Sequence, residues 1–261
     1  MRLGTWRCLL AVVLTISSCL AAPCHAQQLT VAAAADLQFA MQDIADRFQK
    51  ETGKTVKVVY GSSGNFLQQI QNGAPFDIFF SANLDYAKKL DTAGLTVPGS
   101  FYEYATGKLV LWVPGSSKLD LGRGLRILTD PSVQKLAIAN PEHAPYGQAA
   151  VAALRAEGIY ESISPKLVLG ENISQAASFV LTGAADAGLV ALSLAVSPNM
   201  KEKGRYVPVP DADYPPIRQA CVILKSSPNQ ALAQSFLRFL RTPAMANVLK
   251  SYGFEIPEAS H

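Results

Sequence analysis

The feature that most constrains the fold of this chain is an alternation of short apolar runs with helix-like segments, joined by brief turns. "QLTVAAAA" at 28–35 predicts a buried strand, and the apolar side chains that follow at helical spacing predict a helix over 37–48. Such alternation is typical of α/β proteins with a largely parallel sheet. We expect further strands at "TVKVVY", "FDIFFSA", "GKLVLWVP", "KLAIAN", "KLVLG", "AGLVALS" and "ACVILK", and further helices at 65–71, 147–157, 174–181, 229–241 and 243–251.

The first residues predict a secretory signal peptide. Arg2 and Arg7 give a basic start, an apolar run covers 8–16, and "CHAQQ" offers a cleavage site after Ala26. The apolar run is too short to span a bilayer as a helix. We therefore expect residues 1–26 to be removed on export. A lipoprotein anchored at Cys19 is the alternative, because "ISSC" loosely resembles a lipidation box, but it ranks second since a good cleavage site follows.

The composition narrows the class of protein. Of the four cysteines only Cys221 lies beyond the predicted leader, so an internal disulfide is excluded and the stability must come from the core. The 23 basic and 20 acidic residues come still closer to neutrality without Arg2 and Arg7. The chain has no basic stripe for a nucleic acid, and no later apolar run reaches membrane length.

Four short loops share one position, since each follows a predicted strand and opens a predicted helix. Ligands of α/β sheets bind beyond the carboxyl ends of strands, and free N–H groups at a helix start favour an anion. Any one of these loops taken alone is better explained as an ordinary turn, although "GSSG" fits either reading. Together they favour a cleft in which neutral donors surround a small oxyanion. The loops are "AAAD" (33–36), "GSSG" (61–64), "APYG" (144–147) and "GENIS" (170–174).

Catalytic, metal and nucleotide sites are poorly supported. The pattern G-x-S-x-G is absent, because Gly61 and Gly64 are three positions apart rather than four, and no lysine follows them as in a phosphate-binding loop. His143 lies alone on a turn and His261 is the last residue, so the sequence offers neither a convincing general base nor a metal-binding pair. We expect no enzyme, no metal ion and no cofactor. A secreted hydrolase that uses Ser62 or Ser63 is the rival hypothesis, and an interaction protein without a small ligand is a third.

The segment "YVPVPDADYPPIRQ" at 206–219 is rich in proline and acidic residues, a composition suited to a connection between lobes. The strand and two helices predicted after it need a sheet to join. Periodicity does not tell which sheet that is, so a return of the chain to its first lobe stays open on the residues alone.

The chain resembles the periplasmic molybdate-binding proteins of ABC transporters. The resemblance covers essentially all of residues 27–261, and it is carried by "TVAAAADLQFAMQDIADRF", "YGSSGNFLQQIQNGAPFDIFFSA", "ANPEHAPYG", "LGENISQAASFV" and "LKSYGFEIP". It implies a two-lobed type II binding protein, in which each lobe is a mainly parallel sheet flanked by helices and two crossover segments form a hinge. Lobe I would comprise 27–107 plus 221–261, and lobe II 108–220.

The resemblance also implies a function. The lobes would close on a tetrahedral dianion, molybdate and also tungstate, without a metal ion or cofactor. Delivery to a permease in the inner membrane, a periplasmic location and a monomer are further expectations. Another tetrahedral oxyanion, sulfate- or phosphate-like, is the alternative ligand. The positions that match the family's site are Ala35, Asp36, Ser63, Tyr146 and Ile173.

Two residues depart from the family's pattern. Ala191 stands where one branch has a tyrosine, and we expect Tyr146 to supply the lost hydroxyl. Asp36 stands where many relatives have Ser or Asn. A carboxylate about 4 Å from one charge of an anion costs roughly 4 kcal/mol at an effective dielectric of 20, and a dianion doubles this cost. We therefore expect the Asp36 side chain to cap its own helix and point away, leaving only its backbone N–H for the ligand.

Overall fold

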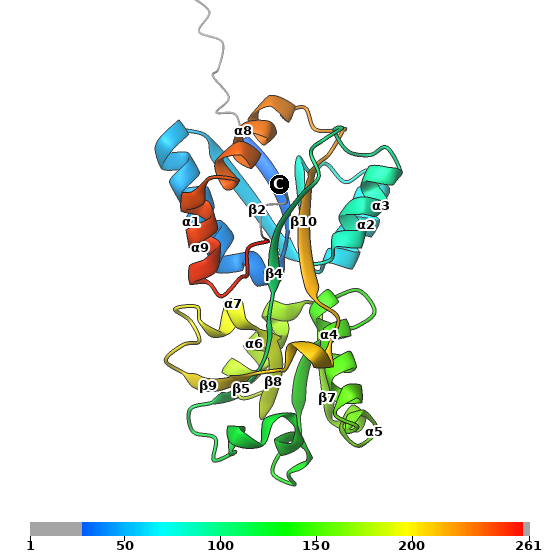
Figure 1. Ribbon diagram of the computed structural model, residues 1–261, viewed down its shortest axis with the longest axis vertical. Helices are drawn as coiled ribbons and strands as arrows, with labels where there is room; N and C mark the ends of the chain where they lie inside the picture. The colour runs from blue at the N-terminus through cyan, green and yellow to red at the C-terminus, as the bar shows by residue number, and fades with distance from the viewer. Residues whose placement is uncertain (1–27, 258–261) are drawn as a thin grey trace, which may run out of the picture.

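The computed structural model describes residues 28–257, which form two lobes stacked along the long axis of the molecule (Figure 1). Each lobe contains one five-stranded sheet, with strand orders β2-β1-β3-β10-β4 and β7-β6-β8-β5-β9. The predicted α/β class with two lobes is confirmed. The predicted signal peptide, the alternative anchor at Cys19 and His261 lie outside the described residues.

Lobe I is built around β1, where Leu29, Val31 and Ala33 on one face and Ala32 on the other are fully buried because helices cover both faces of the sheet. The helix predicted over 37–48 is confirmed as α1, and Gly53 ends it in the left-handed conformation at φ 70°. The strands are β1 (Gln28–Ala34), β2 (Thr55–Gly61), β3 (Ile78–Ser81), β4 (Tyr102–Gly107) and β10 (Ile217–Ile223); the helices are a 3-10 helix (Ala35–Leu37), α1 (Gln38–Thr52), α2 (Ser63–Gln71), α3 (Leu84–Thr92), α8 (Gln230–Leu240) and α9 (Pro243–Ser251).

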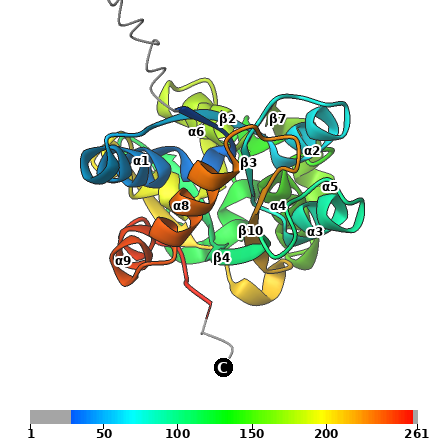
Figure 2. The same ribbon diagram turned by 90° about the horizontal axis from the view of Figure 1, so that it is seen from above.

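The helices of lobe I lie on opposite faces of its sheet (Figure 2). Helices α1, α8 and α9 cover one face, where Phe48 of α1 meets Phe236 of α8 edge to face at 5.1 Å between ring centroids. Helices α2 and α3 cover the other face, where Phe66 packs near Phe79 of β3. Each face has its own hydrophobic cluster, so the lobe holds its loops on a rigid base.

Lobe II has the same arrangement around β6 and β8. Its core includes the fully packed Trp112 of β5 and the alanine-rich inner face of α4. The strands are β5 (Leu109–Pro114), β6 (Leu136–Ala139), β7 (Leu167–Gly170), β8 (Ala187–Ala191) and β9 (Gly204–Pro208); the helices are α4 (Pro145–Ala156), α5 (Tyr160–Ile163), α6 (Ile173–Leu181), α7 (Leu192–Ala195) and the 3-10 helices Leu121–Thr129, Ser164–Lys166 and Asp211–Asp213.

Two segments cross between the lobes. Strand β4 continues into β5 through Lys108, and residues 209–216 lead from β9 back to β10. Strand β10 and helices α8 and α9 therefore return to lobe I (Figure 1). The predicted boundary between 220 and 221 falls inside β10, which begins at Ile217 directly after two prolines.

Two details differ from the pattern-based expectation. Strands β10 and β5 each enter a sheet from the other lobe and pair antiparallel with both neighbours, so half of the strand pairings are antiparallel. The first residues of "YVPVPDADYPPIRQ" belong to β9, which pairs with β5 at the edge of its sheet, where proline is tolerated. Among residues 28–257, no helix combines the length and apolarity that crossing a membrane requires.

Candidate functional site

The four strand-to-helix loops meet between the lobes. They line a cavity of about 10 Å³, close to the space of one water molecule. Its lining comes from residues 34–36 after β1, 61–63 after β2, 144–146 after β6 and 172–173 after β7, with Ala82. All five predicted site residues line this cavity: Ala35, Asp36, Ser63, Tyr146 and Ile173.

Helix starts point their unpaired N–H groups toward this region. Ser63 is the first residue of α2 and Ile173 the first of α6, so their N–H groups have no acceptor within the helix. The preceding residues cap the helices, because Ser62 Oγ accepts from the Asn65 N–H at 3.4 Å and Asn172 Oδ1 from the Gln175 N–H at 3.1 Å. With α4 also beginning at the cavity, three helix starts favour negative charge there.

Ser63 is placed as a hydrogen-bond donor. Its side chain is buried, and its Oγ accepts a hydrogen bond of 2.9 Å from the Ala82 N–H. A hydroxyl has one hydrogen to donate, and this bond does not use it. The Ser63 hydroxyl is thus oriented by Ala82 and keeps its hydrogen for an acceptor in the cavity.

Asp36 is not placed as predicted. Neither the 3-10 helix that contains it nor α1 has a side-chain cap, so the expectation that its carboxylate caps its own helix is wrong. The 3-10 turn instead directs the side chain into the interface between the lobes. There Asp36 Oδ2 accepts from Tyr146 Oη at 3.0 Å and from Gln219 Nε2 at 2.5 Å. Hydrogen bonds to side chains of α4 and β10 therefore replace the predicted hydrogen bond to the helix start.

Asp36 is only 1 % exposed, and its Oδ1 is buried without a hydrogen-bond partner. Burial raises the pKa of Asp36 to about 6, although the two hydrogen bonds that Gln219 and Tyr146 donate to Oδ2 lower it, and the backbone N–H groups of Asp36 and Leu37 close to the carboxyl lower it further. A buried carboxylate loses water that two hydrogen bonds do not fully replace, which disfavours the charged form.

A buried polar network extends from Asp36 through lobe I. Gln219 Nε2 donates to Asp36, and Gln219 Oε1 accepts from Tyr104 Oη at 2.7 Å. Burial raises the pKa of Tyr104 and of Tyr146 well above the ordinary value, so both hydroxyls stay neutral. Gly107, the last residue of β4, makes room for the network, because a Cβ there would overlap the Tyr146 hydroxyl.

Sequence reasoning missed the network because Tyr104, Gly107 and Gln219 lie on strands far along the chain from Asp36. Nothing in their local pattern marks them as part of a site. The expectation that the Tyr146 hydroxyl contacts the ligand stays a prediction, since that hydroxyl donates to Asp36 here.

Further hydrogen bonds join the two lobes around the cavity. The Gly64 N–H donates to the His143 carbonyl at 2.9 Å, in a spot too tight for any Cβ. Ser174 Oγ donates to the Ala35 carbonyl at 2.9 Å, and Ser193 Oγ to the Asp36 carbonyl at 2.7 Å. The loops of one lobe are therefore anchored by the loops of the other.

Ser62 and His143 form a pair that the sequence did not reveal. Ser62 Oγ lies 2.8 Å from His143 Nδ1, while it also caps α2. Within residues 28–257 no carboxylate hydrogen-bonds to the histidine ring, so the third group that orients a catalytic base is missing. The same described part of the chain holds no cluster of three His, Cys, Asp or Glu residues suited to a metal ion.

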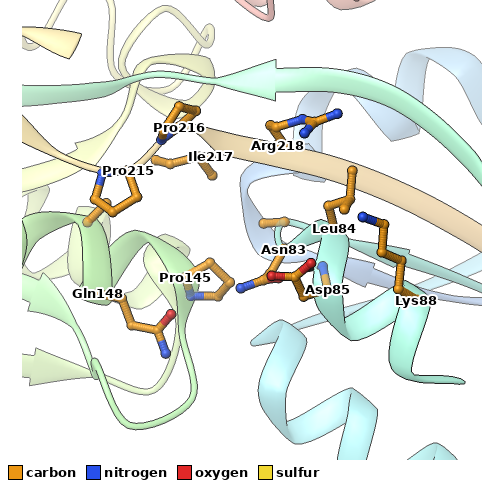
Figure 3. Close-up of a pocket in the computed structure, with 12 residues that line it drawn as sticks. Asn83, Leu84, Asp85, Lys88, Pro145, Gln148, Pro215, Pro216, Ile217 and Arg218 are labelled. Carbon is orange, nitrogen blue, oxygen red and sulfur yellow. Dashed lines mark hydrogen bonds between the residues drawn. The ribbon is translucent and has the colours of Figure 1, made fainter. Parts of the chain in front are cut away.

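A larger groove of about 280 Å³ lies beside the cavity and shares Ala82 and Pro145 with it. Figure 3 shows Asp85 and Lys88 of lobe I facing this groove, with Arg218 near the crossover segment. Arg218 already forms an ion pair with Glu103, at 2.5 Å between Nη2 and Oε2. The groove has exposed, solvated charges, whereas the cavity has buried, neutral donors.

Residues 29–255 match the family described as bacterial extracellular solute-binding protein. The chain belongs to this family. Among its relatives, the molybdate-binding protein ModA of Rhodobacter capsulatus is 40% identical over 94% of both chains. ModA of Azotobacter vinelandii is 42% identical over 90% of this chain and 92% of its own length.

Solved structures agree with this assignment. The periplasmic molybdate-binding protein of Azotobacter vinelandii superposes with a TM-score of 0.83 at 35% identity, covering 88% of this chain and all of that one. The sulfate-binding protein SubI of Mycobacterium tuberculosis gives 0.71 at 14% identity over 90% of this chain and 88% of its own, a likeness of fold alone. The predicted two-lobed binding-protein fold is confirmed. This solute-binding protein is a binding protein rather than an enzyme, so the hydrolase alternative falls.

Proposed function

We propose that this solute-binding protein captures molybdate in the periplasm and delivers it to the permease of an ABC transporter. The observation that carries the proposal is the meeting of four strand-to-helix loops, two from each lobe, around one small cavity lined by no lysine or arginine. Relatives of 40% and 42% identity that are molybdate-binding proteins support the same ligand. Export by the signal peptide at 1–26, and a monomer as the working form, complete the proposal.

The binding mechanism follows from the donors. The Ser63 hydroxyl and the N–H groups at Ala35, Asp36 and Ile173 would hold the oxygens of a tetrahedral dianion, with Tyr146 closing the cavity from lobe II. Neutral donors fixed in a buried place stabilise an anion strongly, because they need no reorganisation and water does not screen them. No cofactor takes part. Tungstate, with the same charge and shape, would use the same donors, whereas sulfate, with shorter bonds, would reach them less well.

A phosphate-like oxyanion is the second candidate, and one observation favours it. Asp36 Oδ1 is a buried acceptor without a partner, and a protonated oxyanion carries a hydrogen to donate to it. A site with donors alone would reject such an anion. Asp36 therefore makes the choice of oxyanion the first question to test.

A thermal-shift panel of molybdate, tungstate, sulfate and phosphate tests the proposal. A ligand at 1,000 times its dissociation constant stabilises a protein by about 4 kcal/mol, so molybdate and tungstate should each raise the melting temperature by several degrees. Ser63→Ala should reduce the molybdate shift. Ser162→Ala, which alters an exposed serine of lobe II, should keep it. Stabilisation by phosphate with none by molybdate or tungstate would overturn the proposal in favour of the second candidate.

A further inference from the structure

We propose that the cavity binds its oxyanion together with one proton, which the complex holds on Asp36. The inference rests on the proposed function and deepens it, because it makes Asp36 the residue that decides which protonation form of an oxyanion the site accepts. It follows from the hydrogen-bond balance of the buried network.

The hydrogens of the network are already used. Tyr146 Oη and Gln219 Nε2 both donate to Asp36 Oδ2, while Tyr104 Oη donates to Gln219 Oε1. Asp36 Oδ1 has no donor, and the residue is 1 % exposed. Asp36 lines the cavity, so a charged Asp36 places an oxygen that carries only lone pairs near a dianion that also carries only lone pairs.

One added proton resolves this conflict. If it sits on Oδ1, the carboxyl becomes a donor to the oxyanion. If it sits on Oδ2 and is donated to Tyr146 Oη, the tyrosine hydrogen is released for the oxyanion instead. Either placement gives the cavity one more donor hydrogen and removes one negative charge. The proposal does not depend on which of the two oxygens holds the proton.

No other group in the surroundings can take over this role. Tyr104 on β4 and Tyr146 on α4 face Asp36, Tyr214 lies next to Tyr146, and burial raises the pKa of all three. From β10 and α7 the neighbours are the neutral Gln219 and Ser193. His143 lies beyond Ser62 and does not line the cavity, and neither a lysine nor an arginine does. Burial alone already favours the protonated carboxyl.

The proton has a consequence for selectivity. Above neutral pH the free protein must take up a proton to bind a dianion without hydrogen, so the dissociation constant for molybdate should rise about tenfold per pH unit. Monohydrogen phosphate brings its own hydrogen and should lose no affinity over the same range. The preference for molybdate over phosphate should thus weaken as the pH rises.

Titration calorimetry of the full mature chain with sodium molybdate tests the inference. At pH 7.5, in two buffers of different ionisation enthalpy, the wild-type protein should take up close to one proton per molybdate. Its dissociation constant should rise about 30-fold from pH 7.0 to 8.5. Asp36→Asn should take up no proton, bind with the same affinity across this range, and exceed the wild-type affinity at pH 8.5.

His143→Gln is the matched control, since it replaces the imidazole that contacts the neighbouring Ser62 and leaves Asp36 unchanged. It should keep the proton uptake, and a loss of uptake there would assign the proton to His143 and overturn the inference. Wild-type binding without proton uptake would overturn it as well, even if Asp36→Asn did not fold, and would leave the proposed function standing. Absence of molybdate binding at every pH would overturn both.

Discussion

The small cavity at the four loops and the larger groove of Figure 3 share a wall between the lobes, yet they differ in size and in charge. The groove measures about 280 Å³ and carries Asp85, Lys88 and Arg218. The cavity measures about 10 Å³, and Asp36 is the only acidic or basic residue among those that line it. Size and positive charge alone would place an anion in the groove.

The contacts in the groove and in the cavity instead favour the cavity as the binding site of the anion. Lys88 and Arg218 are exposed, and Arg218 is already paired with Glu103, so water and a partner compete with any anion there. In the cavity, the Ser63 hydroxyl and the helix starts are buried and held by neighbours. Oriented neutral donors that face no competition from water therefore suit an oxyanion better than solvated cations do.

The largest expected effect is on the pH dependence of the protein's stability, and it comes from the buried carboxyl of Asp36. The pKa of Asp36 is about 6 in the folded protein, above its ordinary value of 3.8, so the folded state binds the proton more tightly than the unfolded state. Stability from this group is complete below pH 3.8 and is lost as the pH rises through 6, a loss of about 3 kcal/mol. In Asp36→Asn the loss should vanish. Denaturant unfolding of both proteins at pH 4 and 7.5 should show most of this loss, about 2.5 kcal/mol, in the wild type only, and an identical pH dependence would contradict it.

Ser63→Ala should weaken molybdate binding about 10- to 100-fold, because it removes a hydrogen bond to a charged ligand and leaves the Ala82 N–H without its acceptor. The loss should be the same at pH 6 and pH 8, since Ser63 does not titrate. Calorimetry at both values measures it. A loss that changes tenfold between them would mean that Ser63 and Asp36 do not act separately.

Gly107→Ala should weaken molybdate binding by about tenfold or more, because overpacking a buried site costs about 1–3 kcal/mol. The new Cβ would displace the Tyr146 hydroxyl from Asp36. Gly115→Ala is the matched control, since a Cβ there meets its nearest atom at an ordinary 3.4 Å. Equal affinities in the two variants would show that the network does not shape the cavity.

The smallest effect should come from the groove. Lys88→Gln should change molybdate affinity less than about twofold at physiological salt, because an exposed charge outside the cavity is largely screened. Competitive binding at 150 mM salt measures it. A tenfold loss would move the binding site from the cavity toward the groove.

Sequence reasoning located the four loops because strand-to-helix turns have a local signal: an apolar run, small residues, and then helical spacing. These loops contain Ala35, Ser63, Tyr146 and Ile173, which the resemblance singled out and which line one cavity. The return of β10 to lobe I has no local signal, and only the resemblance implied it. The orientation of the Asp36 side chain depends on its hydrogen bond with Gln219, which lies on the returning strand β10. The prediction that Asp36 caps its own helix was therefore wrong.

Strand β9 and the antiparallel pairing of β5 and β10 likewise depend on tertiary partners and have no local signal in the sequence. Whether a Pro-rich segment joins a sheet edge depends on the partner that tertiary structure brings to it, here β5. The Ser62–His143 contact likewise joins residues of different lobes, and no pattern within either loop predicts it.

An anomalous difference map from crystals grown with molybdate, recorded near the molybdenum absorption edge, shows directly where the oxyanion binds. The account predicts one peak in the cavity, with oxygens in hydrogen-bond reach of Ser63 Oγ and the Ile173 N–H, and no peak beside Lys88 or Arg218. A peak in the groove alone would contradict it.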